Sequence, residues 1–404
     1  MRTVVRMAIV VAALGAGCLP APPEAVRTPA VSRGATASPT AATAPSGAPP
    51  SLRLVGPIQR LDAATGFVAT ETGLLATSDG GRAWELRTRT SGAFFSELRF
   101  TDADHGWAVI ERWGSDQRCA APDLAAPCST LMSTTDGGRS WRDRLSRPTA
   151  GIDGPAVTSL QAVEGTTAWV IATAAGCSAG SCPRELLATR DAGVSWVVQR
   201  SAPGLTFARF ASADRGWVAV ARAGDVNGGA EILATSDGGG TWQSQQLTAT
   251  SVVGLDSASE VVAWVLTRDG GYCTASSCTR YELIRTNDGG RTWERLGNPL
   301  ANACSGGHLR GPLFASASVG WLGISLGAGG AGVGAGGLLA TRDSGRSWEC
   351  RTTPQNVAAI SAADPLHVWV RSDPAGRDPK GTQPALFATD DGGATWRAVA
   401  IALR

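Results

Sequence analysis

The stretch Thr77-Ser78-Asp79-Gly80-Gly81-Arg82-Ala83-Trp84 decides the fold, because six close copies of it follow. Every copy keeps a Thr, an Asp two residues later, a Gly two residues after that, and a Trp five residues after the Asp. Successive aspartates are 57, 55, 46, 51, 55 and 48 residues apart, and a period near 50 residues indicates an array of similar structural units. The aspartates are Asp79, Asp136, Asp191, Asp237, Asp288, Asp343 and Asp391, and the tryptophans are Trp84, Trp141, Trp196, Trp242, Trp293, Trp348 and Trp396.

The repeated stretch has the chemistry of a turn between two strands. An Asp side chain accepts hydrogen bonds from backbone N–H groups a few residues further on. The Gly adopts a backbone angle that other residues resist. A catalytic role for the aspartates is the alternative, and seven equivalent copies favour the structural role. We expect each Trp of the repeat to bury its ring between neighbouring units.

A second aromatic residue precedes each copy of the repeat and follows a turn. These residues are Phe67, Trp107, Trp169, Trp217, Trp264, Trp321 and Trp369. With apolar runs such as 217–221 and 231–235, each unit is interpreted as four short strands, the last two joined by the repeated turn. Four aspartates ahead of the second strand are interpreted as turn formers: Asp62, Asp104, Asp214 and Asp364.

The repeat is identified as the Asp-box, or BNR, repeat, and residues 52–404 resemble Asp-box β-propellers. The resemblance implies an all-β fold, a seven-bladed β-propeller of four-stranded antiparallel blades. Unit one has its own first strand near 55–61 and unit seven its own fourth strand at 396–402, so no swapped closing strand is needed. The phrases Gly106-Trp107-Ala108-Val109 and Gly216-Trp217-Val218 resemble the photosystem II stability/assembly factor type of propeller. That family implies an exported, often lipid-anchored assembly factor that binds protein, without catalysis and without a cofactor.

The N-terminal residues are typical of an export signal. Residues 1–17 place two arginines before a short apolar run, the pattern of a signal peptide. Cys18 follows Leu14-Gly15-Ala16-Gly17, which resembles a bacterial lipobox with Gly15 where a branched residue is usual; ordinary secretion is the alternative. Residues 18–51 contain this Cys and a linker rich in Pro, Ala, Thr and Ser, which we expect to be disordered. The protein is therefore expected on the outer face of a bacterial membrane, held by acyl chains.

The near-equal numbers of basic and acidic residues bear on the class of partner that the protein can bind. The chain has 36 Lys and Arg against 34 Asp and Glu, which argues against nucleic-acid binding through a broad basic surface. Its three histidines have no partner at metal-ligand spacing. We expect a monomer without a metal, which contacts the membrane only through its lipid anchor and binds a protein or a glycan.

Eight cysteines remain after Cys18, and export makes disulfides plausible. Three pairs are close in sequence, at spacings of nine and five residues with no His nearby, so disulfides are favoured over a metal site. The pairs are Cys119 with Cys128, Cys177 with Cys182, and Cys273 with Cys278. Cys304 and Cys350 are left and are expected to pair with each other.

The segments between second and third strands are long and varied in six of the seven units. In a four-stranded meander they all emerge on one face, opposite the repeated turns. Variable loops on a rigid scaffold usually carry recognition, so we expect binding on this face or at its central mouth. The candidate contacts are Arg112, Trp113, Arg118, Arg184, Arg268, Tyr272, Arg280, Tyr281 and Arg377. Trp113 lies outside both aromatic sets and is the preferred hot spot, with packing inside its own loop as the alternative.

A glycoside hydrolase is the alternative function, because sialidases and some glucanases also carry Asp-boxes. A sialidase needs an arginine cluster and a Tyr nucleophile, but Tyr272 and Tyr281 flank the Cys273–Cys278 loop rather than an inner strand. The usual Arg-Ile-Pro near the start is also absent. An inverting glucanase needs two carboxyls about 6.5–9.5 Å apart, and no particular pair stands out. No residue is therefore assigned a catalytic role, and the protein is expected to be a binding scaffold.

Overall fold

The computed structural model describes eleven stretches of the chain: residues 52–112, 128–148, 156–175, 182–221, 229–247, 251–269, 280–301, 307–325, 337–353, 356–372 and 384–403. The predicted signal peptide (1–17), Cys18 and the linker (18–51) lie outside them. Residues 49–404 form one compact unit. Among the described stretches there is no helix of the length and apolar character that crossing a membrane requires.

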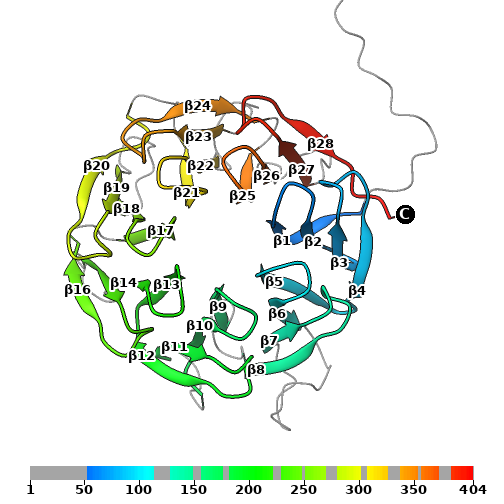
Figure 1. Cartoon of the computed structure of the whole chain (residues 1–404), viewed down its shortest axis with the longest axis horizontal. Coiled ribbons are helices and arrows are strands. Elements are labelled where there is room, and N and C mark those ends of the chain that lie inside the picture. The colour runs from blue at the N-terminus through cyan, green and yellow to red at the C-terminus, as the bar shows by residue number, and fades with distance from the viewer. Residues whose placement is uncertain are drawn as a thin grey trace, which may run out of the picture. The chain divides into compact units, whose positions relative to one another are not determined.

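The described residues form a seven-bladed β-propeller. Seven four-stranded antiparallel sheets, numbered here as blades 1 to 7 in chain order, surround a common centre (Figure 1). Each blade consists of four consecutive strands, the first nearest the centre and the fourth on the outside. The predicted seven-bladed, all-β fold is confirmed, and no strand is exchanged between the first and last blades.

The strand bounds follow the repeat. Blade 1 contains β1 (Leu54–Arg60), β2 (Gly66–Thr70), β3 (Gly73–Thr77) and β4 (Glu85–Arg89); blade 2 contains β5 (Ala93–Phe100), β6 (Gly106–Arg112), β7 (Cys128–Thr134) and β8 (Arg142–Pro148). Blade 3 contains β9 (Val157–Ala162), β10 (Ala168–Thr173), β11 (Arg184–Thr189) and β12 (Val197–Ala202); blade 4 contains β13 (Leu205–Phe210), β14 (Gly216–Ala221), β15 (Ala230–Thr235) and β16 (Gln243–Gln246). Blade 5 contains β17 (Ser251–Ser257), β18 (Ala263–Asp269), β19 (Arg280–Thr286) and β20 (Glu294–Gly297). Blade 6 contains β21 (His308–Phe314), β22 (Gly320–Ser325), β23 (Gly337–Thr341) and β24 (Glu349–Thr352); blade 7 contains β25 (Val357–Ala362), β26 (Val368–Ser372), β27 (Ala385–Thr389) and β28 (Arg397–Val399).

The core lies between neighbouring blades. The aromatic residue at the second position of each second strand is at most 1% exposed, as the buried apolar runs predict. Trp169 of blade 3 stacks on Phe210 of blade 4 with ring centroids 3.8 Å apart, and Trp264 of blade 5 stacks on Phe314 of blade 6 at 3.5 Å. Each blade therefore buries its apolar faces only against its neighbours.

Each repeated turn is closed by its own side chains. In the second repeat, Asp136 Oδ1 accepts the Thr134 hydroxyl at 2.8 Å and the Ser140 N–H at 2.9 Å, and Oδ2 accepts the Ser140 hydroxyl at 2.6 Å. Thr134 Oγ1 in turn accepts the N–H of Gly138, whose φ is +83°. These bonds lower the pKa of Asp136 to about 2, and the Ser140 hydroxyl is the largest cause. The Thr-to-Asp bond recurs in all seven repeats.

The tryptophans of the repeat are less buried than the sequence predicts. Trp84 is 1% exposed, because the C-terminal tail covers it. Its Nε1 donates to the carbonyl of Ala400 at 3.1 Å, and its backbone forms an isolated parallel β-bridge with Leu403. The other six lie immediately before the outer strands and are partly accessible to solvent. These half-buried residues are Trp141, Trp196, Trp242, Trp293, Trp348 and Trp396.

The turn formers are only partly those predicted. Asp62 and Asp364 each accept two N–H groups of their own turn, as expected. In blades 2 and 4 the acceptors are Asp102 and Ser212, two residues before the predicted Asp104 and Asp214. In a turn of this kind the accepting side chain precedes the N–H groups that it binds, so the predictions of Asp104 and Asp214 as the acceptors are wrong.

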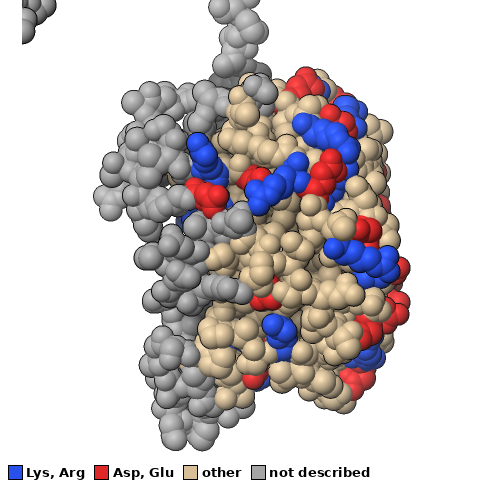
Figure 2. All heavy atoms as spheres, turned by 90° about the vertical axis from the view of Figure 1, so that its left-hand side faces the viewer, with Lys and Arg blue, Asp and Glu red and all other residues tan. Residues whose placement is uncertain are grey.

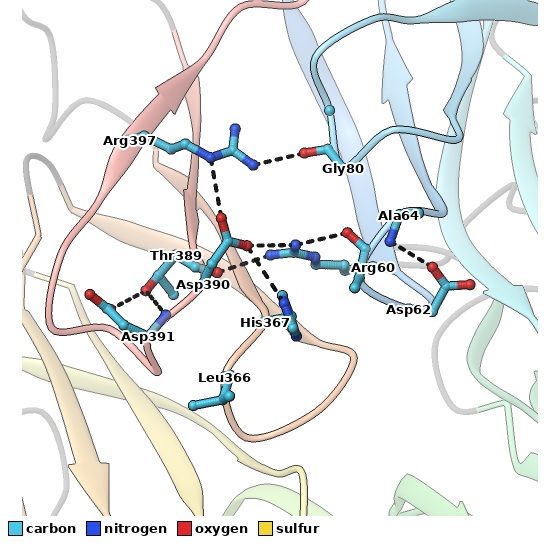
Figure 3. A network of polar contacts seen from close by, with 12 residues as sticks. Arg60, Asp62, Ala64, Gly80, Leu366, His367, Thr389, Asp390, Asp391 and Arg397 are labelled. Carbon is cyan, nitrogen blue, oxygen red and sulfur yellow. Dashed lines mark hydrogen bonds and ion pairs between the residues drawn. The ribbon is translucent and has the colours of Figure 1, made fainter.

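The first and last described stretches of the chain meet between blades 7 and 1. The N–H of Leu52 donates to the carbonyl of Ile401 at 3.0 Å, just beyond β28. β28 is shorter than the expected 396–402, because the tail after Val399 leaves blade 7 to contact blade 1. Figure 3 shows the polar network at this seam, on the side of the repeated turns. It includes the ion pair between Arg60 of β1 and Asp390 of blade 7.

The outer wall carries charges of both signs. Figure 2 views the side with β16 and β20, where acidic and basic side chains are interleaved. Arg285 and Glu294 form an ion pair at 2.7 Å within blade 5, and Arg346 of blade 6 reaches the same carboxylate at 3.2 Å. The Arg346–Glu294 pair is exposed and contributes little stability, whereas Arg285 is buried behind the shared carboxylate. The described residues on this side therefore form no extended surface of one charge.

Candidate functional site: the loop face

The strand order gives the two faces of the ring different characters. The repeated turns and the turns between first and second strands lie on one face, here called the turn face. The connections between second and third strands leave from the other, here called the loop face. Apart from the short turn at 71–72, these connections pass through undescribed residues: 113–127, 176–181, 222–228, 270–279, 326–336 and 373–383. The described part of the loop face therefore consists mainly of the ends of the second strands and the starts of the third strands.

Two of the predicted contacts, Arg112 and Arg184, are arginines hydrogen-bonded to strand residues at the loop face. Arg112 ends β6, and its Nη1 donates to Thr130 Oγ1 at 3.3 Å. Arg184 begins β11, and its Nη2 donates to the hydroxyl of Thr158 on the inner strand β9. Burial lowers the pKa of Arg184, but an arginine remains charged at neutral pH. Both side chains are half-buried, so the framework orients them while part of each stays accessible.

Two further predicted contacts are exposed. Arg268 lies near the end of β18 and Arg280 begins β19, the strand paired with it. They flank the undescribed connection 270–279 at the edge of blade 5. A guanidinium forms planar, charge-assisted hydrogen bonds with a carboxylate and hydrogen bonds with carbonyl oxygens.

Tyr281 does not occupy the exposed position that the sequence suggests. It is 3% exposed, and its phenolic oxygen accepts the N–H of Leu309 from blade 6 at 3.2 Å. It differs from its neighbour Arg280 because successive residues of a strand face opposite sides. The prediction of Tyr281 as a surface contact is wrong, since the side chain joins blades 5 and 6. Trp113, Arg118, Tyr272 and Arg377 lie outside the described residues.

Sequence reasoning missed two loop-face residues. Arg371, near the end of β26, donates from Nη1 to the carbonyl of Gly56 in blade 1. Glu111, next to Arg112 on β6, is 7% exposed and accepts hydrogen bonds from Ser96 at 3.0 Å and from Ser129 at 2.7 Å. Burial raises the pKa of Glu111. Both residues lie near the end of a second strand, and this position in the sequence would have predicted them.

Three cysteines of the predicted pairs are described, and each is disulfide-bonded: Cys128 at the start of β7, Cys182, and Cys350 in β24. Cys119, Cys177, Cys273, Cys278 and Cys304 lie outside the described residues. The pairing itself therefore stays a prediction.

Both carboxylates that the inner strands carry are engaged between blades. Glu97 of β5 accepts the N–H of Ser159 in blade 3 at 3.2 Å, and burial raises its pKa. Asp256 of β17 pairs with Arg209 of blade 4 at 2.9 Å and accepts the N–H of Phe314 in blade 6 at 2.6 Å. These acids hold blades together. Among the described residues, no three His, Cys, Asp or Glu side chains gather as a metal site would require.

Comparison with solved structures gives the same fold from independent chains. YCF48 bound to a D1 peptide is 18% identical, over 80% of this chain and 89% of that one, with a TM-score of 0.51. An oligogalacturonate lyase in complex with manganese is 9% identical, over 87% and 86%, with a TM-score of 0.52. An ancestral GH74 enzyme is 12% identical, over 86% of this chain but 55% of that one, with a TM-score of 0.51.

These likenesses show the fold alone. No protein-family model and no curated protein sequence matches this chain. Because one of these structures is bound to a peptide and the others are enzymes by name, the fold does not select a function.

Proposed function

We propose that this protein is an exported binding scaffold, a lipid-anchored Asp-box propeller that holds a protein partner on its loop face without catalysing a reaction. The signal peptide, the lipobox at Cys18 and the linker would place the ring outside a bacterial membrane. In this proposal the aspartates of the repeat are structural, and a glycan is the alternative ligand.

The engagement of the inner-strand carboxylates is the observation that carries the proposal. A glycosidase needs two carboxyls free to act on a substrate. Glu97 and Asp256 are instead bonded to the neighbouring blades, and the Asp of each repeated turn is bonded inside that turn. Chemistry that used these carboxylates would have to break bonds that hold the blades or the repeated turns.

The loop face has the features of a recognition surface. Its strand ends present Arg112, Arg184, Arg268 and Arg280, two of them fixed by hydrogen bonds and two exposed. Arginine is enriched at protein interfaces because it combines charge, several donors and a planar surface. YCF48, which shares the fold, binds a peptide of D1. A polypeptide with exposed carboxylates or carbonyl oxygens fits these donors.

Photo-crosslinking in the cells that export the protein tests the proposal. A crosslinking residue replaces Arg268 or Arg280 on the loop face, and the matched controls replace Arg139 or Arg291, which are exposed on the turn face. We expect a discrete protein adduct from the loop-face positions and none from the controls. Adducts from the turn face alone, or turnover of a fluorogenic glycoside panel by the purified full chain, would overturn the proposal.

A further inference from the structure

The outer strand of blade 3 differs from the outer strands of the other six blades. β12 begins with Val197 and Val198, which are 60% and 50% exposed. Every other outer strand begins with a charged residue or a glutamine: Glu85, Arg142, Gln243, Glu294, Glu349 and Arg397. An outer strand has no neighbour on its outer side, and charged side chains usually protect such an edge from association. Blade 3 lacks this protection where its outer strand begins.

The repeated turn of blade 3 adds a third exposed valine next to this edge. Val194 is 76% exposed, and the other six turns have Arg82, Arg139, Gly240, Arg291, Arg346 and Ala394 at the same position. Three of the seven large apolar side chains that are exposed among the described residues therefore lie within five positions of sequence. We call Val194, Val197 and Val198 the valine patch, which lies at β12 on the outside of the ring (Figure 1). Single exposed valines are ordinary, whereas a group of them marks a contact surface.

The two ends of the valine patch carry opposite charges. At the turn end, the carboxylate of Asp191 is exposed and accepts the Ser195 hydroxyl at 2.6 Å. At the other end, Arg200 is half-buried, and its Nε has no acceptor among the described residues. Arg190, beside Asp191, is turned toward blade 4, where its Nη2 donates to the carbonyl of Ala213 at 3.1 Å. The edge is therefore acidic at one end, apolar in the middle and basic at the other end.

We propose that a second copy of this chain packs on the valine patch across a two-fold axis, with the two β12 strands antiparallel. When Val197 of one copy lies opposite Val198 of the other, Arg200 lies opposite Ser195, whose hydroxyl is bonded to Asp191. A two-fold axis repeats this contact, because both copies use the same surface. Each basic end then meets an acidic end while the valines meet in the middle, so the edge is complementary to itself.

The composition of the patch favours a second strand over a membrane surface. Valine is branched at Cβ and packs well against the side chains of a neighbouring strand. Membrane-surface contacts typically combine Trp, Phe or Leu with Lys and Arg, whereas here an acid lies at one end. One short strand from each copy forms a small interface, and interfaces of that size belong to weak, transient complexes. We therefore expect a dimer that dissociates on dilution, in place of the monomer expected from the sequence.

The dimer leaves the loop face of each copy accessible. β12 runs from the repeated turn toward the loop face, so antiparallel packing points the two loop faces in opposite directions. The inference does not rest on the proposed function, and its test needs no partner. An adduct between two copies contains this chain alone, so its mass distinguishes it from an adduct with a partner on the loop face.

Photo-crosslinking between differently tagged copies tests the contact in the cells that export the protein. A crosslinking residue replaces Val197, and the matched control replaces Gln243, the exposed first residue of the outer strand in blade 4. Two full chains with different epitope tags are expressed together, so an adduct that carries both tags joins two copies. We expect at least tenfold more of this adduct from position 197 than from position 243, with the crosslink ending in residues 194–202 of the other copy.

Sedimentation velocity of the full chain in a mild detergent gives the dissociation constant of the dimer. Val197→Lys/Val198→Lys should weaken the dimer at least tenfold, because like charges then meet at the centre of the contact. Gln243→Lys/Ser244→Lys adds the same charges at the exposed equivalent positions of blade 4 and should stay within twofold of the parent value.

Arg200→Gln is the second variant, because it keeps the valines and removes the basic end of the edge. It should weaken the dimer at least threefold while its melting temperature shows that it is folded. If the double lysine variant of blade 3 does not fold, Arg200→Gln decides alone. Absence of association between copies, equal effects in the two lysine pairs, an unchanged dissociation constant in Arg200→Gln, or an adduct from position 197 with only a lipid or another protein would overturn the proposal.

Discussion

Arg60 of the first strand and Asp390 of the last blade form an ion pair of 2.8 Å across the seam between blades 1 and 7. The arginine side chain is 1% exposed and also donates to the carbonyls of Thr389 at 3.0 Å and Ala63 at 3.1 Å (Figure 3). At the equivalent position, three other seams carry a phenylalanine: Phe100, Phe210 and Phe314, each stacked on an aromatic of the preceding blade. Arg60 instead lies over Trp369, with its guanidinium 5.7 Å from the ring centroid. The closing seam is therefore fixed by directional bonds.

Removing Arg60 should destabilise the ring more than removing Asp390. Arg60→Ala removes the donor of the Thr389 carbonyl and leaves Asp390 a longer contact with Arg397 at 3.6 Å, and we expect a loss of about 3 kcal/mol. Asp390→Asn should cost about 1 kcal/mol, because Asp390 is half-exposed and Arg60 keeps two other acceptors. Urea denaturation measures both. Arg139→Gln, which removes an exposed pair with Glu85, should change stability by less than about 0.5 kcal/mol. Equal effects in all three variants would contradict this account of the seam.

Stacking between blades should dominate the stability of the other seams. Phe210→Ala removes a ring that lies 3.8 Å from Trp169, nearly parallel to it, and we expect a loss of about 3–5 kcal/mol. Val197→Ala, at a residue 60% exposed on the outer strand β12, should be neutral to within about 0.5 kcal/mol. Equilibrium denaturation of both variants checks the comparison. A loss below about 1 kcal/mol in Phe210→Ala would mean that the blades are held together in another way.

Two glycines with nearly the same φ allow the cost of a steric clash to be distinguished from the cost of backbone strain. Gly290 of a repeated turn has φ +94°, and a Cβ there would lie 2.7 Å from Ala234 and 2.9 Å from Trp217. Gly297 has φ +88° and open space around the same position. Gly297→Ala should cost about 1 kcal/mol, from backbone strain alone. Gly290→Ala should cost about 2–3 kcal/mol more, because Trp217 belongs to the core. A melting-temperature shift of equal size in the two variants would show that the turn does not pack against the neighbouring blade.

Acid should unfold the ring over a definite range. The pKa of Asp136 is lowered to about 2, first by the Ser140 hydroxyl, and that of Asp191 to about 2, first by the Ser195 hydroxyl. A lowered carboxyl pKa in the folded state gives stability that is complete above the unfolded value of about 4 and is lost as the pH falls through the folded value. Burial raises the pKa of Glu97 and of Glu111, so their contributions have the opposite sign and increase as the pH falls through those raised values.

The free energy of unfolding, measured from pH 7 to pH 2, should therefore pass through a maximum in mild acid and fall steeply between about pH 4 and pH 2. Asp136→Asn should reduce the steepness, because one fewer carboxylate takes up a proton on unfolding. A stability profile that stays flat below pH 4 would show that these aspartates are not bonded as described.

The local chemistry of the repeat explains why the fold could be predicted from the sequence. Thr134, Asp136 and Ser140 lie within seven residues of one another and complete their turn without help from the rest of the chain. Seven such turns and seven buried aromatics suffice to specify seven blades. The two positions of the turn formers that were wrong, 104 and 214, are shifts of two residues within otherwise correct turns.

The residues that join blades could not be predicted in the same way. Arg60 contacts Asp390 across 330 positions of sequence, and Arg209 meets Asp256 only because two inner strands lie in a particular register. Tyr281 and Arg280 are neighbours in sequence, yet one is buried and the other exposed, because the side that a strand residue faces depends on its partner strands. Arg268 and Arg280 are therefore exposed on the loop face as predicted, whereas Tyr281 is buried between blades.

The central claim is that the loop face binds the partner and the turn face does not. One charge-matched comparison tests it most directly. The double variants Arg268→Gln/Arg280→Gln on the loop face and Arg139→Gln/Arg291→Gln on the turn face each remove two exposed positive charges. The measurement is the affinity of the full-length protein for the partner that crosslinking identifies, at a fixed salt concentration. We predict a loss of at least tenfold in the loop-face variant and less than twofold in the turn-face variant. A loss in the turn-face variant with the loop-face variant unchanged would contradict the account.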